Sequence, residues 1–212
     1  MESLDYKKRV LLEAFVDLRI AVLVYLIGVI LVLIALGAAV SAVISADTSI
    51  IAALGLSAAG LALLVLGGLL LLASFLKLYG SAEKFEAADP RLSGLKKRIQ
   101  LAILAVALVI LGGIIDYVSP TIGSAIITLA GILSVIAQIL IGLFFMELGN
   151  LEREGIPVPS GFRTVGILYL IGIVIGVLQP IALILAYLYS GEAIRRLSTE
   201  LGESLHSPTT PT

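Results

Sequence analysis

The chain has no cysteine, a single histidine and few charged residues. Without cysteine it has no disulfide framework, no cysteine-ligated zinc site and no cysteine nucleophile. The one histidine, His206, lies in a tail rich in serine, threonine and proline, so the sequence holds no cluster of histidine ligands. Charged residues make up 14% of the chain, against about 25% in soluble domains. The net charge of −1 provides no field for capturing nucleic acid.

Hydrophobic residues take the place of the missing charges. They make up 59% of the chain, above the roughly 45–50% of a soluble domain. A helix that crosses a bilayer needs about 20 apolar residues. Long uncharged runs, each sufficient for one crossing, occupy residues 20–46, 48–76, 99–115, 117–146 and 164–191. We therefore expect an all-α polytopic membrane bundle with about five transmembrane segments, a helical domain over residues 20–197 and the lipid bilayer as its surroundings.

Lysine and arginine are confined to alternate connections. Twelve of them lie in residues 1–19, 77–98 and 147–163, whereas the other two connections between runs carry only Asp47 and Asp116. Basic residues accumulate on the cytoplasmic side of membrane proteins. The pattern predicts a multi-pass protein of the cell membrane with a cytoplasmic N-terminus.

The two ends of the chain differ in composition. Residues 1–19 place leucines and Phe15 on one helical face and charged residues on the opposite face. This predicts an amphipathic cytoplasmic helix that extends the first span or, alternatively, lies on the membrane surface. Residues 198–212 are polar and end in a Ser/Thr/Pro segment, which predicts a disordered tail.

The last apolar run, residues 164–191, is interrupted by Gln179 and Pro180. Proline removes a helical hydrogen bond and clashes with the preceding turn, so we expect a helix break here. The favoured interpretation is a single kinked crossing, since membrane helices tolerate proline. The alternative is a short hairpin that enters from the cytoplasm and returns to it, which would account for Arg195 and Arg196 beyond the run.

Helical hairpins recur along the sequence. One unit begins at Arg19 and turns at Asp47, and a second begins at Arg98 and turns at Asp116. A third, shortened unit begins at Arg163. The first two would be parallel repeats because they have the same orientation. The shared composition of membrane helices is the alternative explanation of the similarity.

Polar side chains are scarce inside the runs, and no Asp, Glu, Lys or Arg lies there. Pumps and coupled transporters place ionisable residues within the bilayer, so such chemistry has no candidate residues here. Small and weakly polar residues share one face of the fourth run: Ser124, Thr128, Gly131, Gln138 and Gly142. We interpret this stripe as a helix-packing surface, with a narrow pore as the alternative. The pair Gly172 and Gly176 is interpreted as a packing element too.

No catalytic motif occurs in the sequence, and we expect no cofactor and no metal. The only candidate pair of carboxylates, Asp47 and Asp116, is explained more simply by capping of helix turns. We expect a non-enzymatic structural, assembly or accessory subunit that acts through helix packing, as a homo-oligomer or with a membrane-protein partner. The alternative is a channel or carrier for a small neutral or lipid-like substrate, built on the stripe and on the break at Gln179 and Pro180.

The order of these features resembles that of a known family. An apolar hairpin is followed by an aromatic-glycine juncture, by Asp89-Pro90, by a glycine-rich hairpin and by a last run around Gly166 with a proline and a tyrosine-rich end. This pattern resembles the archaeal multi-pass membrane proteins known only as a domain of unknown function (number 973 type), over most of residues 10–197. The resemblance carries over no activity and no site residue. A chain with one asparagine, three glutamines, two methionines and no cysteine also has the composition of a thermophilic protein.

Overall fold

The computed structural model describes residues 4–45, 50–116, 119–154 and 156–206. Over these residues the chain is an all-α bundle, which confirms the expected fold class. Short 3-10 turns, Pro90–Leu92 and Leu151–Glu154, follow two of the helices. The α-helices are α1 Leu4–Ser45, α2 Ile50–Ala88, α3 Leu95–Asp116, α4 Pro120–Asn150, α5 Gly161–Gly172 and α6 Leu178–His206.

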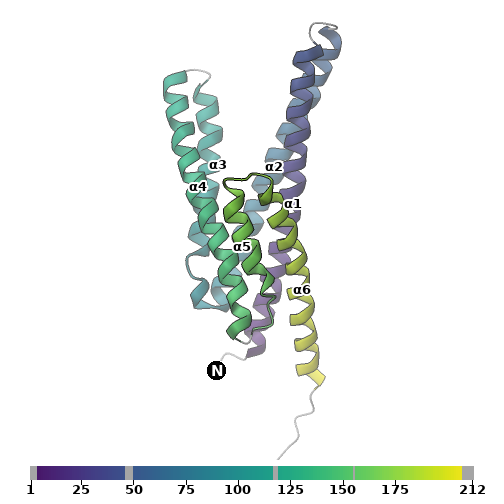
Figure 1. Ribbon diagram of the computed structural model, residues 1–212, viewed down its shortest axis with the longest axis vertical. Helices are drawn as coiled ribbons and strands as arrows, with labels where there is room; N and C mark the ends of the chain where they lie inside the picture. Colours follow the sequence, from purple (N-terminus) through teal and green to yellow (C-terminus); the bar gives the residue numbers. More distant parts are fainter. Residues whose placement is uncertain (1–3, 46–49, 117–118, 155, 207–212) are drawn as a thin grey trace, which may run out of the picture.

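Consecutive helices pair as three antiparallel hairpins, α1–α2, α3–α4 and α5–α6 (Figure 1). Helix α3 also contacts α2, α5 packs on α4, and α6 packs on α1, so the hairpins close into a ring. The first two hairpins are tall and diverge from each other away from the chain termini, whereas the third ends near half their height (Figure 1). The ring is therefore complete only in the half of the molecule that holds the termini.

Three helices in the described part of the chain are long and apolar enough to cross a membrane. These spans are Asp5–Ala38, Ala58–Ala88 and Thr121–Asn150. Large apolar side chains remain exposed along the same helices, and exposed apolar surface of this extent is typical of contact with a membrane or another protein. The fold is that of a helical membrane protein. Helix α5 has 12 residues and is about 18 Å long, which is shorter than the roughly 30 Å hydrocarbon core.

The last apolar run does not form the single kinked helix that the sequence analysis favours. Helix α5 ends at Gly172, the chain turns through residues 173–177, and α6 returns antiparallel to α5. The turn is held by backbone bonds such as Leu178 N–H to the Ile175 carbonyl, at 2.9 Å. The break thus precedes Gln179 and Pro180, which lie in the first turn of α6. Proline fits there because the first turn of a helix contains no carbonyl four residues earlier within the helix to which its N–H groups would bond.

The N-terminal end of the chain is helical as its composition predicts, whereas the C-terminal end is more helical than predicted. Helix α1 runs without interruption from the N-terminal segment into the first span, in agreement with the helical-extension interpretation. Helix α6 continues to His206, so the prediction of disorder is wrong for residues 198–206. Buried Leu197 and the ion pair of Glu200 with Lys8 hold this end of α6 against the bundle. Residues 207–212 lie outside the described part of the chain.

An aromatic cluster forms the core of the closed half of the ring. Phe15 of α1 meets Phe85 of α2 edge-to-face at 5.0 Å and Phe162 of α5 at 5.6 Å. Phe144 of α4 contacts Phe85 at 5.6 Å. All four rings are fully buried. Each aromatic side chain of this kind buries roughly 150–250 Å² of its surface. The cluster is therefore a main source of apolar stabilisation.

Glycines allow α4 and α5 to approach closely. A Cβ atom on Gly166 of α5 would lie 2.6 Å from the Gly142 carbonyl oxygen and 2.8 Å from the Met146 backbone nitrogen. Both glycines are buried. Only residues without a side chain fit at this crossing, as is common between membrane helices. The predicted packing role of Gly142 agrees with this contact.

We expect Gly166→Ala to destabilise the protein by about 1–3 kcal/mol, because the added methyl overpacks the α4–α5 crossing. Unfolding in detergent, followed by circular dichroism, measures the change. Gly131→Ala is the matched control, since a Cβ atom there meets nothing within 4 Å. Equal stabilities of the two variants would contradict the close approach.

Candidate functional site

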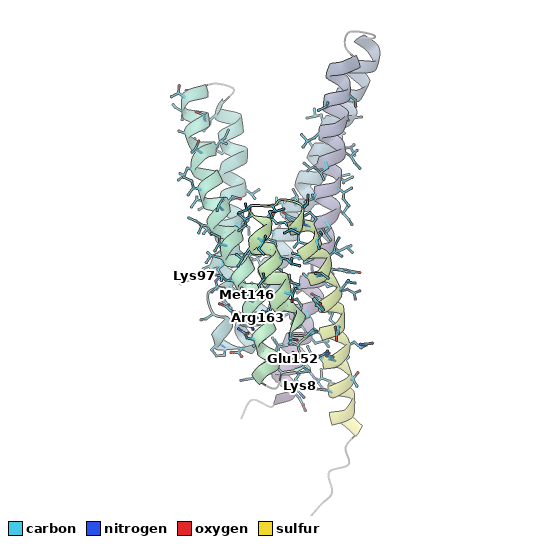
Figure 2. The ribbon with its side chains drawn as sticks, viewed as in Figure 1. Lys8, Lys97, Met146, Glu152 and Arg163 are labelled. Atoms are coloured by element: carbon cyan, nitrogen blue, oxygen red, sulfur yellow. The ribbon has the colours of Figure 1, made fainter. Side chains whose placement is uncertain are left out.

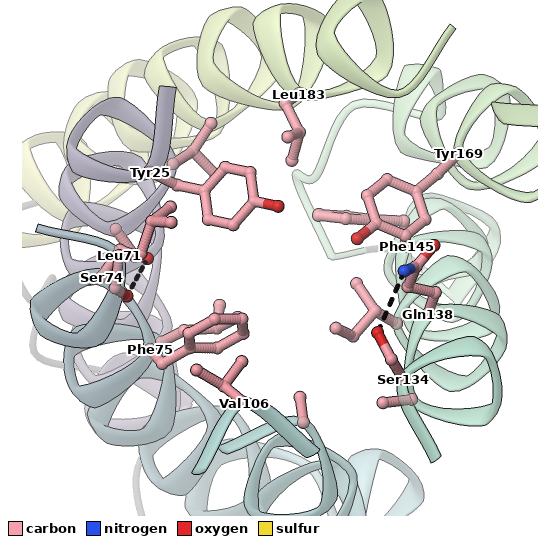
Figure 3. Close-up of a pocket in the computed structure, with 16 residues that line it drawn as sticks. Tyr25, Leu71, Ser74, Phe75, Val106, Ser134, Gln138, Phe145, Tyr169 and Leu183 are labelled. Carbon is pink, nitrogen blue, oxygen red and sulfur yellow. Dashed lines mark hydrogen bonds between the residues drawn. The ribbon is translucent and has the colours of Figure 1, made fainter. Parts of the chain in front are cut away.

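A partly open cavity of about 190 Å³ lies inside the ring (Figure 3). Every one of the described α-helices contributes to its wall, so it depends on closure of the ring. Most of the wall is aliphatic or aromatic. The lining residues are Ala21, Val22, Tyr25, Leu71, Ser74, Phe75, Leu78, Ala102, Val106, Ser134, Ala137, Gln138, Ile141, Phe145, Tyr169 and Leu183.

Aromatic rings give the cavity a firm wall on two sides. Phe145 contacts Tyr169 at 6.0 Å and stacks with Phe162 of the aromatic core at 6.3 Å. On the facing side, Tyr25 of α1 meets Phe75 of α2 edge-to-face at 6.1 Å. The cavity is therefore continuous with the packed core, and its shape is set by the same contacts that hold the helices together.

Two tyrosine hydroxyls point into the cavity from opposite walls, Tyr25 from α1 and Tyr169 from α5 (Figure 3). Hydrogen bonds between the lining residues join Ser74 Oγ to the Leu71 carbonyl and Gln138 to Ser134, and neither tyrosine hydroxyl takes part in them. No carboxylate, ammonium or guanidinium group belongs to the lining residues. The site therefore offers neutral hydrogen-bonding groups in an apolar surrounding.

The two glutamines inside the apolar runs lie together. Gln179 Nε2 donates to Gln138 Oε1 at 2.6 Å, and Gln138 Nε2 donates to Ser134 Oγ at 3.3 Å. This short chain of bonds fastens the first turn of α6 to α4 at the tip of the third hairpin. Gly172 supports the arrangement, because a Cβ atom there would lie 2.7 Å from the Gln179 backbone nitrogen. Gly176 is exposed and makes no such contact.

The structure divides the predicted stripe of α4 into two parts. Gln138 lines the cavity, and Gly142 packs on α5. Ser124, Thr128 and Gly131, farther from the chain termini, are exposed. Thr128 Oγ1 donates to the Ser124 carbonyl at 2.8 Å, so its hydroxyl is satisfied within the helix. These three residues are not among those that line the cavity.

The structure does not describe a site formed by Asp47 and Asp116, the pair of carboxylates that the sequence analysis considers. Asp47 lies outside the described residues, and Asp116 ends α3. The α1–α2 and α3–α4 hairpins diverge toward that end of α3 (Figure 1). No group of three or more His, Cys, Asp or Glu side chains that could hold a metal ion is found among the described residues.

Charged side chains gather in the closed half of the ring, near the chain termini. Ion pairs join Lys8 of α1 to Glu200 of α6 at 2.6 Å and Arg98 of α3 to Glu147 of α4 at 3.1 Å. Four charged residues of this half are labelled in Figure 2: Lys8, Lys97, Glu152 and Arg163. The molecule thus has one charged end and, along its tall hairpins, an apolar exposed surface.

A further polar contact ties the α4–α5 connection to α6. Glu152 accepts a hydrogen bond from the Ser160 backbone N–H at 3.1 Å and pairs with Arg196 at 3.3 Å. A hydrogen bond from Ser160 is the main cause that lowers the pKa of the Glu152 carboxyl, and a hydrogen bond from Arg196 lowers it further. The carboxylate therefore stays ionised at neutral pH at the charged end of the bundle.

Sequence reasoning missed both tyrosines of the cavity. Their positions within apolar runs are the available signal, but tyrosine in such runs is also typical of the membrane interface. Comparison of the chain with known proteins gives no match to a family model, to a curated protein or to a solved structure.

Gln138→Leu and Gln179→Leu should each destabilise the protein by about 1 kcal/mol, because each leaves the partner amide unsatisfied. The double variant should cost little more than one single variant, with a coupling of about 0.6–1.7 kcal/mol. Denaturant unfolding in detergent provides the four stabilities of this cycle. Strictly additive losses would show that the two amides do not pair.

Proposed function

We propose that this protein is a multi-pass membrane protein that binds and carries a small neutral, lipid-like molecule in its central cavity. The cavity itself supports this proposal, since its wall is apolar and includes a few polar groups. Concave apolar sites with a small number of polar groups are typical of small-molecule binding. The function is carriage of a ligand, without a catalytic step.

The size and charge of the site restrict the ligand. An apolar cavity of about 150 Å³ holds benzene, so a cavity of about 190 Å³ accommodates one substituted ring or a short stretch of acyl chain. An ionised ligand would lose its hydration without gaining a charged partner, because the lining residues are all neutral. A neutral molecule that partitions into the bilayer fits both conditions.

In this proposal the charged end of the bundle faces the cytoplasm. It contains most of the lysine and arginine residues, and the positive-inside rule assigns such an end to the cytoplasmic side of the cell membrane. The α1–α2 and α3–α4 hairpins then cross the bilayer, while α5–α6 enters from the cytoplasm and returns. Both chain termini are cytoplasmic, and the cavity lies within the half of the bilayer nearer the cytoplasm.

A second candidate function is that of an accessory subunit, as the sequence favours. The exposed face with Ser124, Thr128 and Gly131 supports it, because small residues allow a helix of another chain to approach closely. A second copy or another membrane protein would cover this face. Native mass spectrometry of the wild type and of Gly131→Leu tests it: a complex that the variant loses supports the function, and a monomeric wild type contradicts it.

Filling the cavity should release its ligand. Ala137→Phe adds a ring to the wall, and we expect at least about tenfold less neutral lipid to copurify with this variant than with wild type, a loss of about 1.4 kcal/mol in binding. Ala125→Phe, at an exposed position of the same helix, is the control. Lipid extraction with mass spectrometry measures the bound material, and circular dichroism confirms folding.

If the cavity binds nothing, Ala137→Phe, Ala125→Phe and wild type should copurify with equal amounts of neutral lipid. That result would contradict the proposed function. Should Ala137→Phe fail to fold, Ala102→Leu replaces it, since Ala102 lines the cavity from α3 and requires a smaller change.

Reporter fusions should place both termini in the cytoplasm. A fluorescent protein that matures only in the cytosol should be active on either end, because α6 returns to the side from which α1 starts. Alkaline phosphatase fused to the same ends should be inactive, since it needs an oxidising exterior to form its disulfides. An active phosphatase on both ends would reverse the proposed orientation.

A further inference from the structure

The cavity points to a carbonyl-bearing ring as the part of the ligand that it recognises. We infer that the ligand is a neutral lipid whose head is a flat ring with carbonyl oxygens on opposite sides, as in a quinone. This inference rests on the proposed function, because it requires that the cavity bind a neutral molecule. The observation behind it is the placement of hydrogen-bond donors across an otherwise apolar space.

The donors come from opposite walls of the cavity. The Tyr25 hydroxyl points inward from α1, and the Tyr169 hydroxyl points inward from α5 (Figure 3). Tyr169 is 7% exposed, and its hydroxyl faces the cavity without a hydrogen bond to another lining residue. Each hydroxyl can donate to a ligand oxygen. A ligand with one acceptor at each end would satisfy both.

Gln138 adds a donor on the same side of the cavity as Tyr169. Its carbonyl oxygen accepts from Gln179, and one of its N–H groups donates to Ser134. A primary amide has two N–H groups, so one remains for a ligand. The Gln138 nitrogen is drawn at the cavity face of α4 in Figure 3. The walls therefore favour an acceptor-rich molecule over a hydrocarbon.

The shape of the space favours a ring over an extended polar head. Phe75 and Phe145 border it on facing sides, and Leu71, Ile141 and Leu183 complete an apolar wall. A ring between such side chains gains aromatic and dispersion contacts. Lipids with phosphate, carboxylate or amine heads lack a charged partner here, whereas carbonyl groups need only the neutral donors that the cavity presents.

A matched pair of ligands tests the inference. Duroquinone and durene share one ring and four methyl groups, and only duroquinone has two carbonyl oxygens. The chain of residues 1–212 in detergent micelles is titrated with each compound at equal mole fraction, and the thermal unfolding midpoint is followed by circular dichroism. We expect duroquinone to raise the midpoint more than durene does. Its dissociation constant should be about three- to tenfold lower than that of durene.

Phenylalanine variants assign the difference to the two hydroxyls. Tyr25→Phe and Tyr169→Phe should each weaken duroquinone binding about three- to tenfold while leaving durene binding unchanged, as one hydrogen bond is lost. Tyr6→Phe is the control, because Tyr6 is 51% exposed and outside the cavity. Loss of duroquinone binding in this control to the same extent would also overturn the inference.

The outcomes separate the two proposals. Equal binding of duroquinone and durene, or no effect of Tyr25→Phe and Tyr169→Phe, overturns the carbonyl inference and leaves a neutral-ligand site in place. Binding of neither compound, together with equal lipid extracts from Ala137→Phe and Ala125→Phe, overturns both the inference and the proposed function.

Discussion

The contact between α6 and α1 is the constraint on which the arrangement depends, because it turns three hairpins into a ring. The Arg19 guanidinium lies 4.4 Å from the centre of the Tyr187 ring and donates to its hydroxyl at 3.2 Å. A cation over an aromatic face is attracted to it, more strongly where water is excluded. Gly191 leaves room for the guanidinium, since a Cβ atom there would lie 3.2 Å from Arg19 Cζ. Without this contact between α6 and α1, the cavity would lose one wall.

The short third hairpin determines where the ring ends. At the level of the aromatic core and the cavity all six helices are present, whereas only the two tall hairpins continue beyond the tip of α5–α6 (Figure 1). The same face of α4 therefore changes partner along its length. It packs on α5 at Gly142, meets α6 at Gln138, and is exposed at Gly131. One difference in helix length thus accounts for both the cavity and the uncovered surface.

Hydropathy predicted the helical class and the presence of helices long and apolar enough to cross a membrane, three of which lie in the described residues, because a bilayer imposes long apolar runs directly on the sequence. The return of the chain was only the alternative to the favoured kinked crossing, since membrane helices tolerate a proline such as Pro180 as a kink. Gln138 and Gln179 were each recognised as interior polar residues, but their pairing depends on the antiparallel return of α6. Tyr25 and Tyr169 were missed because the opposition of their hydroxyls is a property of the closed ring, which local sequence does not encode.

The most direct test of the closed ring is the distance between the N-terminal part of α1 and the C-terminal part of α6. The chain has no cysteine, so spin labels can be introduced at Lys7 and Thr199 alone, two exposed positions beside the Lys8–Glu200 ion pair. Dipolar electron spin resonance of this doubly labelled protein in lipid bilayers should give a single short distance, below about 30 Å, the thickness of the hydrocarbon core. A distance well above that thickness would place α6 across the membrane and contradict the ring.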